Sequence, residues 1–365
     1  MFRFHVVQAE FGDCLLLEFG SKGNPRFVLI DGGPPSTFDD HLSGVLTQIA
    51  KTKAPLDLTV LSHVDDDHIV GLVDYFSAMQ AGAADLPKPK ELWHNSWGKA
   101  LDPGGQLAPR IASLMTLTRT AAMPYATHAL LGIEGGNALR TKATLLGVPI
   151  NQSIGNGALI TVDDVHAPFT FDNLTLQVVA PTKANLESLH KEWEAWLDKH
   201  EADLATDDPK VMANSDRSVP NLSSIALLAK ADGKSILLTG DGRSDHLLQG
   251  MKQAGVLDAD GSGHVDVLKL AHHGSDRDVT QSFFKTVTAD TYVASANGRY
   301  GNPDIATLVW IVDQAKQDGR KITLVVTNDT PSLAELKAKC PPDKYSYTVE
   351  LMPKGDHSLV LTLAE

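Results

Sequence analysis

The chain has 365 residues, of which 42% are hydrophobic and 21% are charged, a composition typical of soluble globular proteins with room for one large or two ordinary domains. Its net charge of −13 argues against a broad nucleic-acid-coating surface, which needs clustered Lys and Arg, although bound divalent ions can supply positive charge within a nuclease site. Its two cysteines, Cys14 and Cys340, are too few for a disulfide framework.

The chain begins with an alternating, strand-like pattern and without the charged head and apolar run of a signal peptide. No apolar stretch approaches the roughly 20 residues needed to span a bilayer. We therefore expect a soluble, cytoplasmic protein with no membrane partner.

Strands are predicted at residues 2–7, 14–19 and 26–30, and a helix at 40–52. The third strand ends in Asp31-Gly32-Gly33, where two glycines after a carboxylate fit a close approach by another backbone. An ordinary tight turn is the local alternative.

The next strand, residues 58–62, runs into His63-Val-Asp65-Asp-Asp67-His68, after which apolar residues recur at helical spacing. Carboxylates favour the N-terminus of a helix, but three together repel one another unless a cation neutralises them. Imidazole and carboxylate groups are ligands for zinc, manganese or iron. The sequence therefore predicts a metal site here, with an acidic turn carrying two incidental histidines as the alternative.

The middle of the chain is more irregular. A strand is predicted at 91–94, and an insertion with flexible joints at 101–140 because of Pro-Gly-Gly at 103–105 and Gly-Gly at 135–136. A short helix at 139–147 and strands at 158–162 and 174–180 follow. The amphipathic helix at 186–200 places two tryptophans on one face, which either docks a partner, caps the site or packs on its own core. Residues 202–217 are predicted to form a mobile loop.

The last third returns to strands, at 223–230, 235–239, 265–270, 291–294 and 322–327, and ends in a predicted hairpin of 345–352 with 358–363. The first two strands are joined by Asp-Gly, a strong hairpin signal. Strands and helices alternate, so the chain belongs to the α/β class.

Chemistry-bearing residues stand where several predicted strands give way to loops: Asp31, the 63–68 cluster, Asp241, and the pair His272-His273. Each signal is weak alone. Strand ends of a layered sheet are where binding sites assemble, so together they predict one metal site. If the histidine pair continued its strand, only one ring would face inward.

The chain resembles the metallo-β-lactamase-fold hydrolases and, within them, the branch typified by the C-terminal domain of the DNA-uptake protein ComEC. The matching segments occur in the family's order and cover most of residues 1–310. They are Gly12–Leu16, Leu29–Gly33, Ser62–Leu72, Asn221–Leu227, Ile236–Asp241 and Leu268–Ser275.

This resemblance implies an αββα sandwich of two mixed sheets, formed by a single domain over residues 1–365 with a variable insertion at about 97–217. It implies two divalent ions, zinc or manganese. One would be held by His63 and Asp65, the second by Asp67 and His68, with Asp241 bridging and His272 or His273 completing the set. Substrate-binding and supporting roles would fall to Asn297, Asn302, Ser275 and Asp31.

Two positions depart from the family's patterns. Asp65 replaces the second histidine of the common His-x-His-x-Asp-His motif, as in the ComEC-type branch, which favours harder ions such as manganese. Asn302 stands where the branch has a histidine in Tyr-Gly-His-Pro, so any role that needs an imidazole there is in doubt.

The resemblance implies a nuclease or phosphodiesterase that acts on DNA through a metal-bound hydroxide, with Asp67 orienting the water or accepting its proton. Hydrolysis of a small molecule (a lactam, thioester, lactone or cyclic nucleotide) is the first alternative, and the acidic surface favours it. The second is an effector module whose latent activity is switched on by a protein partner docked at 186–217.

Overall fold

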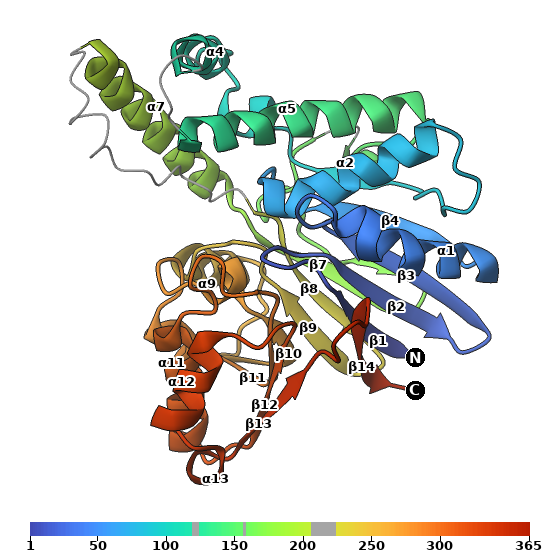
Figure 1. The fold of residues 1–365 in the computed structure, drawn as a ribbon, viewed down its shortest axis with the longest axis vertical. Coiled ribbons are helices and arrows are strands. Elements are labelled where there is room, and N and C mark those ends of the chain that lie inside the picture. The colour runs from blue at the N-terminus through green and yellow to red at the C-terminus, as the bar shows by residue number, and fades with distance from the viewer. Residues whose placement is uncertain (119–123, 156–157, 206–223) are drawn as a thin grey trace.

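The computed structural model describes residues 1–118, 124–155, 158–205 and 224–365. Its framework is two mixed β-sheets packed face to face, with helices on both outer sides (Figure 1). One sheet has six strands in the order β14-β1-β2-β3-β4-β5, and the other has eight in the order β13-β12-β11-β10-β9-β8-β7-β6.

The six-stranded sheet is antiparallel from β14 to β3 and parallel from β3 to β5. Strand β4 is buried at every position, including the polar Asp57 and Thr59, because both faces of the sheet are covered here. Helices α1, α2 and α5 cover the outer face. The bounds are β1 Phe2–Val7, β2 Leu15–Ser21, β3 Asn24–Ile30, β4 Leu56–Leu61, β5 Leu92–His94, β14 Ser358–Ala364, η1 Phe38–Leu42, α1 Ser43–Thr52, α2 Asp66–Gln80 and α5 Pro124–Leu145.

The eight-stranded sheet is antiparallel from β6 to β9 and parallel from β9 to β13. Its outer face carries helices α9 to α12. The bounds are β6 Phe169–Phe171, β7 Leu174–Ala180, β8 Ala226–Ala231, β9 Lys234–Leu238, β10 Gly263–Lys269, β11 Val287–Ala294, β12 Ile322–Val326, β13 Tyr347–Leu351, α9 Ser244–Gln253, η2 Ala271–Gly274, α10 Gln281–Thr286, α11 Ile305–Gln317, α12 Pro331–Lys339 and α13 Pro342–Tyr345.

Three apolar layers hold the sandwich together. The central one lies between the sheets and joins side chains such as Phe4 and Val60 to Leu176 and Val267. The other two lie between each sheet and its own helices. The predicted αββα sandwich is therefore confirmed.

A fourth apolar cluster joins α3 (Trp97–Leu101), α4 (Leu107–Thr118) and α7 (Lys183–Ala205) beside the sandwich. Trp193 is only 3% exposed, and its ring stands 5.8 Å from that of Trp97, edge to face. This tryptophan of the amphipathic helix thus packs on the protein's own core. The predicted mobile loop at 202–217 begins inside α7, and its residues 206–217 lie outside the described residues.

The prediction of a flexible joint at 135–136 followed by a short helix at 139–147 is wrong. Helix α5 runs without a break from Pro124 to Leu145. A Cβ added at Gly136 would lie 3.1 Å from Val64 Cγ1, and one at Gly135 would lie 3.4 Å from Ile69 Cδ1. The two glycines therefore let α5 pack closely on the segment around α2.

The predicted strand at 158–162 is also absent from the structure of those residues, which form no ladder. The Asn95 side chain takes the place of a partner strand. Its amide donates to Ile160 O at 2.9 Å, and its oxygen accepts from Ile160 N at 2.7 Å. These two bonds satisfy the backbone without a sheet.

The predicted C-terminal hairpin is wrong in its pairing. Both strands exist, but β13 pairs with β12 in the eight-stranded sheet and β14 pairs with β1 in the six-stranded sheet. The turn at 353–356 carries the chain from one sheet to the other. Tyr347 of β13 packs in the layer outside the eight-stranded sheet, whereas Leu359 of β14 packs in the central layer.

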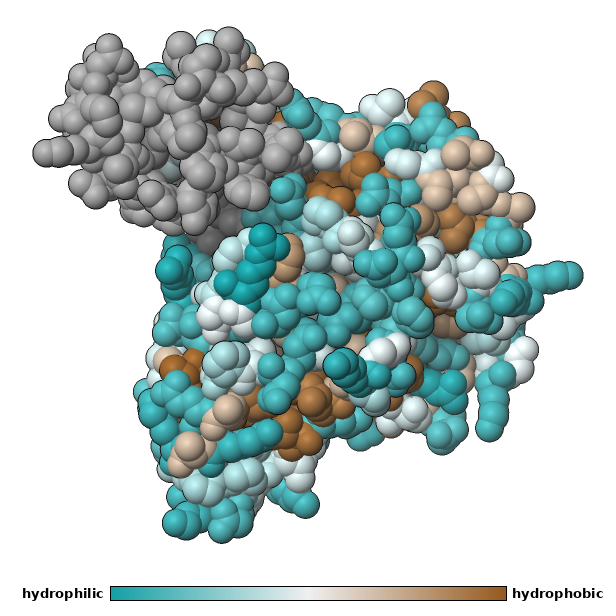
Figure 2. Space-filling model, in the orientation of Figure 1, coloured by the Kyte–Doolittle hydropathy of each residue, from teal (hydrophilic) through white to brown (hydrophobic). Residues whose placement is uncertain are grey.

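Within the described ranges, no helix is both long and apolar enough to cross a bilayer. The face seen in Figure 2 is mostly hydrophilic and carries separate, small hydrophobic patches.

Candidate metal centre

The site begins where β3 ends, at Asp31. This buried carboxylate accepts hydrogen bonds from Ser62 N and Ser62 Oγ, both at 2.7 Å, and lies 2.8 Å from His68 Nδ1. The turn after it comes so close to α2 that a Cβ on Gly71 would lie 1.9 Å from Gly32 O. The predicted close backbone approach is confirmed, and it fixes the start of α2 against β3.

Asp241, at the end of β9, lies at the centre of four imidazole rings. Its Oδ2 is 3.5 Å from His63 Nε2 and 3.8 Å from His272 Nε2. Its Oδ1 is 3.2 Å from His68 Nε2 and 3.8 Å from His273 Nε2. Ligand-type groups from the ends of β4, β9 and β10 therefore meet at one point.

The first pair of rings is oriented from behind by Ser62 and Asp31. Ser62 Oγ donates its hydrogen to Asp31 and lies 3.0 Å from His63 Nδ1, so His63 Nδ1 acts as the donor to it. His68 Nδ1 donates to Asp31. Both rings consequently turn an unprotonated Nε2 toward Asp241 when they are neutral, as metal-binding histidines do.

The second pair has carboxylate partners of its own. His272 Nδ1 bonds to Asp278 Oδ2, and His273 Nδ1 lies 3.3 Å from Asp13 Oδ1. The other oxygen of Asp13 lies 2.6 Å from the fully buried Lys269 ammonium. All four rings therefore present Nε2 inward.

Several buried nitrogen and oxygen atoms at the centre of the site lack a hydrogen-bond partner. His63 Nε2, His68 Nε2, His273 Nε2 and Asp241 Oδ1 are shielded from solvent and have no hydrogen-bond partner within the described parts of the chain. Orphaned polar atoms are unfavourable in a protein interior. A cation with nitrogen and carboxylate ligands would satisfy them, so the residues present fit a divalent metal.

The pKa shifts in the site also favour a bound cation. Burial alone would raise the pKa of Asp241, but His68 and His272 hold it well below the usual range. Burial alone would lower the pKa of His68, but Asp241 raises it well above normal. Against the effect of burial, Asp241 and Asp278 raise the pKa of His272 to about 9. The carboxylates and histidines around Asp241 are therefore stabilised by positive charge, which either protons or metal ions that displace them can supply.

Both members of the histidine pair face the site, contrary to the expectation that one would point away. They lie in η2, a single turn, with φ of 48° at His272 and 57° at His273. The strand has already ended at Lys269. Strand alternation therefore does not apply to them.

The two predicted aspartates of the 63–68 turn lie on the open side of the cluster. Asp67 Oδ2 is 3.3 Å from His273 Nε2, and Asp65 Oδ2 is 4.0 Å from His63 Nε2. Burial, reinforced by the neighbouring carboxylates, raises the pKa of Asp65 to about 6. Against the effect of burial, His68 and His273 lower the pKa of Asp67.

The three predicted substrate-binding residues surround η2 and the loop after β11. Ser275 N donates to His272 O at 2.9 Å, and Asn302 Nδ2 donates to the same oxygen at 3.2 Å. Asn297 Nδ2 donates to Glu10 Oε2 at 2.9 Å. They support the loops around the site, and their contact with a substrate stays a prediction.

Sequence reasoning missed four supporting residues: Asp13, Ser224, Lys269 and Asp278. Ser224 Oγ contacts His63 Nδ1 at 3.2 Å and accepts from Asp241 N at 3.1 Å. Asp13, Ser224 and Lys269 fall within the quoted family segments. Their position inside these segments was the available signal, and Asp278 lies outside them.

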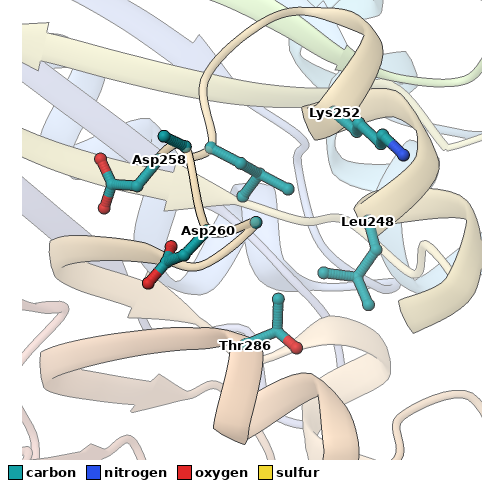
Figure 3. Close-up of a pocket in the computed structure, with 8 residues that line it drawn as sticks. Leu248, Lys252, Asp258, Asp260 and Thr286 are labelled. Atoms are coloured by element: carbon teal, nitrogen blue, oxygen red, sulfur yellow. The ribbon is translucent and has the colours of Figure 1, made fainter.

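A pocket of about 560 Å³ lies elsewhere, between the last turns of α9 and the loop before β10 (Figure 3). Leu248 and Lys252 line one side, and Asp258 and Asp260 the other. It is at the opposite end of β10 from the histidine pair, and a strand of 7 residues spans about 23 Å. This pocket is not part of the metal centre.

The first third of the sequence resembles one family of known proteins. The family model for the metallo-beta-lactamase superfamily matches residues 8–130, which hold Asp31 and the 63–68 turn. No curated protein sequence matches the chain. A crystal structure named "Putative metal-dependent hydrolase", from Parabacteroides distasonis, is 11% identical with a TM-score of 0.35, and the similarity covers 86% of this chain and 93% of that one.

The last likeness is too low to define fold or function. The superfamily match and the two-sheet sandwich together give the chain a metallo-β-lactamase fold. The ligand atoms of His63, Asp67 and His68 all lie within 4.8 Å of one another. Together with the superfamily match, this supports a metal-dependent hydrolase.

Proposed function

We propose that the protein is a phosphodiesterase that hydrolyses DNA with two divalent ions bound around Asp241. The observation that carries this proposal is that the two oxygens of Asp241 face different pairs of histidine rings. Its Oδ2 faces His63 and His272, while its Oδ1 faces His68 and His273. A carboxylate with a ring pair on each oxygen is suited to bridge two ions.

The first ion would be held by His63, His272 and Asp241, with Asp65 near the open side. The second would be held by His68, His273 and Asp67 with the other oxygen of Asp241. Mixed imidazole and carboxylate ligands suit zinc and manganese. When bound, such ions lower the pKa of a coordinated water and neutralise charge on the attacked phosphate.

Asp67 is the residue that we expect to interact with the attacking water. Its side chain is 20% exposed, whereas that of Asp241 is 2% exposed. Because His68 and His273 lower its pKa, Asp67 is ionised at neutral pH and can accept a hydrogen bond that orients a water molecule at the mouth of the site.

DNA as the substrate is supported by the resemblance to the ComEC-type branch. The net charge of −13 favours a small substrate instead, because an acidic surface repels a polyanion at low salt. The substrate must therefore be decided by a direct assay.

The assay incubates purified protein with linear, circular and single-stranded DNA and with manganese or zinc. We expect cleavage by the wild type and at least a hundredfold loss in Asp67→Ala and Asp241→Ala. Asp260→Ala, an exposed aspartate of the distant pocket, is the control and should retain activity.

A panel of a lactam, a thioester, a lactone and a cyclic nucleotide is tested in parallel with the same metals. Intact DNA together with turnover of one panel member would replace the DNA proposal by a small-molecule hydrolase. If all DNA stays intact and no panel member turns over, the hydrolase proposal itself is wrong.

A further inference from the structure

Three side chains, two of them exposed and one half-buried, form a cluster on two loops beside the metal centre. Phe11 follows β1, and Arg299 and Tyr300 follow β11. The two rings stand 5.6 Å apart, edge to face. The Arg299 guanidinium carbon lies 4.4 Å from the centre of the Phe11 ring and 5.4 Å from that of Tyr300. We call these three residues the stacking cluster.

Two members of the stacking cluster are exposed to solvent, and Phe11 is half-buried. Tyr300 is 64% exposed, one of the few large apolar side chains so exposed among the described residues. Arg299 is also exposed, and it has no ion pair within the described residues. The guanidinium contacts the Phe11 and Tyr300 rings and has no carboxylate partner in the described part of the chain, so its N–H groups are available to an anionic ligand in a chain with a net charge of −13.

The two loops are joined to each other behind the cluster. Ser295 Oγ donates to Gly12 O at 2.5 Å, and Asn297 Nδ2 donates to Glu10 Oε2 at 2.9 Å. The rings of the cluster are therefore carried on a braced pair of loops, which keeps the cost of ordering them on binding low.

Each loop is also tied to the metal centre. Asp13 N donates to Asp67 O at 3.1 Å, and the Asp13 carboxylate contacts His273. On the other loop, the Asn302 amide donates to His272 O. Phe11 and Tyr300 stand two residues from Asp13 and Asn302, so their Cα atoms lie within about 8 Å of those anchors.

These features define the ligand's chemistry. Aromatic faces stack on nucleobases without regard to sequence, and an arginine adds a cation–π contact and a charged edge for phosphate. In a duplex the faces of the bases are already stacked, so only unpaired bases are available.

We propose that the stacking cluster binds a nucleobase and its adjacent phosphate in single-stranded DNA, next to the scissile bond. This inference rests on the proposed phosphodiesterase function and assigns its substrate class as unpaired strands. Its alternative is a purely structural contact that closes the two loops.

The test measures binding separately from cleavage. A fluorescein-labelled decathymidylate and an abasic decamer of the same length and charge are titrated with protein in EDTA and again in manganese, with fluorescence anisotropy as the readout. We expect the wild type to bind the base-containing strand about 5- to 150-fold more tightly than the abasic one, the range that one stacked base supplies.

Tyr300→Ala and Arg299→Gln should lower affinity for the decathymidylate about tenfold and leave the abasic strand less affected. Tyr300→Phe should keep the preference, because it keeps the ring. Lys316→Gln is the matched control: its ammonium lies 4.0 Å from the centre of the Tyr345 ring on another face, and its loss should change nothing.

Equal affinity for the two strands in both buffers, or variants that bind like the wild type, would overturn the inference. If Tyr300→Ala fails to fold, as judged by thermal melting, Arg299→Gln decides. Base-dependent binding without cleavage would refute the proposed hydrolysis of DNA and leave the proposed binding of a nucleobase by the stacking cluster standing. Cleavage of DNA without base-dependent binding would support the proposed hydrolysis of DNA and refute the role of the stacking cluster.

Discussion

Lys269 Nζ lies 2.6 Å from Asp13 Oδ2, and neither side chain is more than 1% exposed. The second Asp13 oxygen lies 3.3 Å from His273 Nδ1. Against the effect of burial, Lys269 and His273 hold the pKa of Asp13 well below its usual range. A charge buried on β10 thus keeps a carboxylate ionised, and that carboxylate aims a candidate metal ligand.

Asp13→Asn should therefore weaken metal binding about 10- to 100-fold, the usual effect of losing a partner behind a ligating histidine. The variant also leaves the buried Lys269 ammonium without its carboxylate, which should cost about 3–5 kcal/mol of stability, so its folded state is checked by circular dichroism before the titration. Isothermal titration of the chelated protein with zinc measures the affinity. An unchanged affinity would show that Asp13 does not position His273.

Lys269→Met should destabilise the protein by about 3–5 kcal/mol, because it strands the Asp13 charge in the interior. Lys234→Met is its control, since Lys234 makes a 2.7 Å ion pair with Asp266 on the same sheet but is 44% exposed, and it should cause little change. Urea denaturation compares the two. Equal effects would mean that the burial of the pair is unimportant.

Metal removal should lower thermal stability through Asp241. If the site holds an ion, zinc at 100 times its dissociation constant stabilises the folded state by about 2.7 kcal/mol, and chelation reverses this. In Asp241→Ala the melting temperature should no longer respond to zinc or EDTA. A response as large as that of the wild type would place the metal elsewhere.

Gly71→Ala should be destabilising, because its Cβ would lie 1.9 Å from Gly32 O, a backbone atom that cannot move aside cheaply. We expect a loss of at least about 1–3 kcal/mol, as for other overpacked interiors. Gly44→Ala, in α1 with no heavy atom within 4 Å of the added Cβ, should instead stabilise by about 0.5–1 kcal/mol. We expect the denaturation midpoint to fall in Gly71→Ala and to rise in Gly44→Ala, relative to the wild type.

His94 should make the protein acid-sensitive. Burial, aided by Arg140, lowers its pKa to about 3, whereas the unfolded value is about 6.5. The unfolded chain therefore takes up the proton first, so stability is full above pH 6.5 and falls by about 1.4 kcal/mol per unit between pH 6.5 and 3. His94→Leu should lose less stability than the wild type between pH 7 and 5 in EDTA, measured by urea denaturation. Parallel curves would contradict this.

Most strands and the 63–68 turn could be predicted because their signals are local, whereas the strand predicted at 158–162 does not form. An apolar run of β4 ends in a dense group of imidazoles and carboxylates, and a helical stripe follows it. The meeting of Asp241 with the histidine pair could be expected because strand ends gather at a sheet edge.

The supporting shell could not be predicted in the same way. Asp13 and His273 are far apart in sequence, and no periodicity links them. The left-handed turn at His272 could not be predicted, because strand alternation was the only available guide to where each ring points. Pairing of strands is equally non-local: Tyr347–Leu351 and Ser358–Ala364 look like partners, yet they join different sheets.

The pairing of β14 with β1, in which Val6 faces Leu359, joins a strand from the start of the chain to one made more than 350 residues later. During synthesis β1 stays an open edge until that late segment leaves the ribosome. An unsatisfied edge invites pairing with neighbouring nascent chains, so this protein should depend on chaperones that shield its N-terminal sheet.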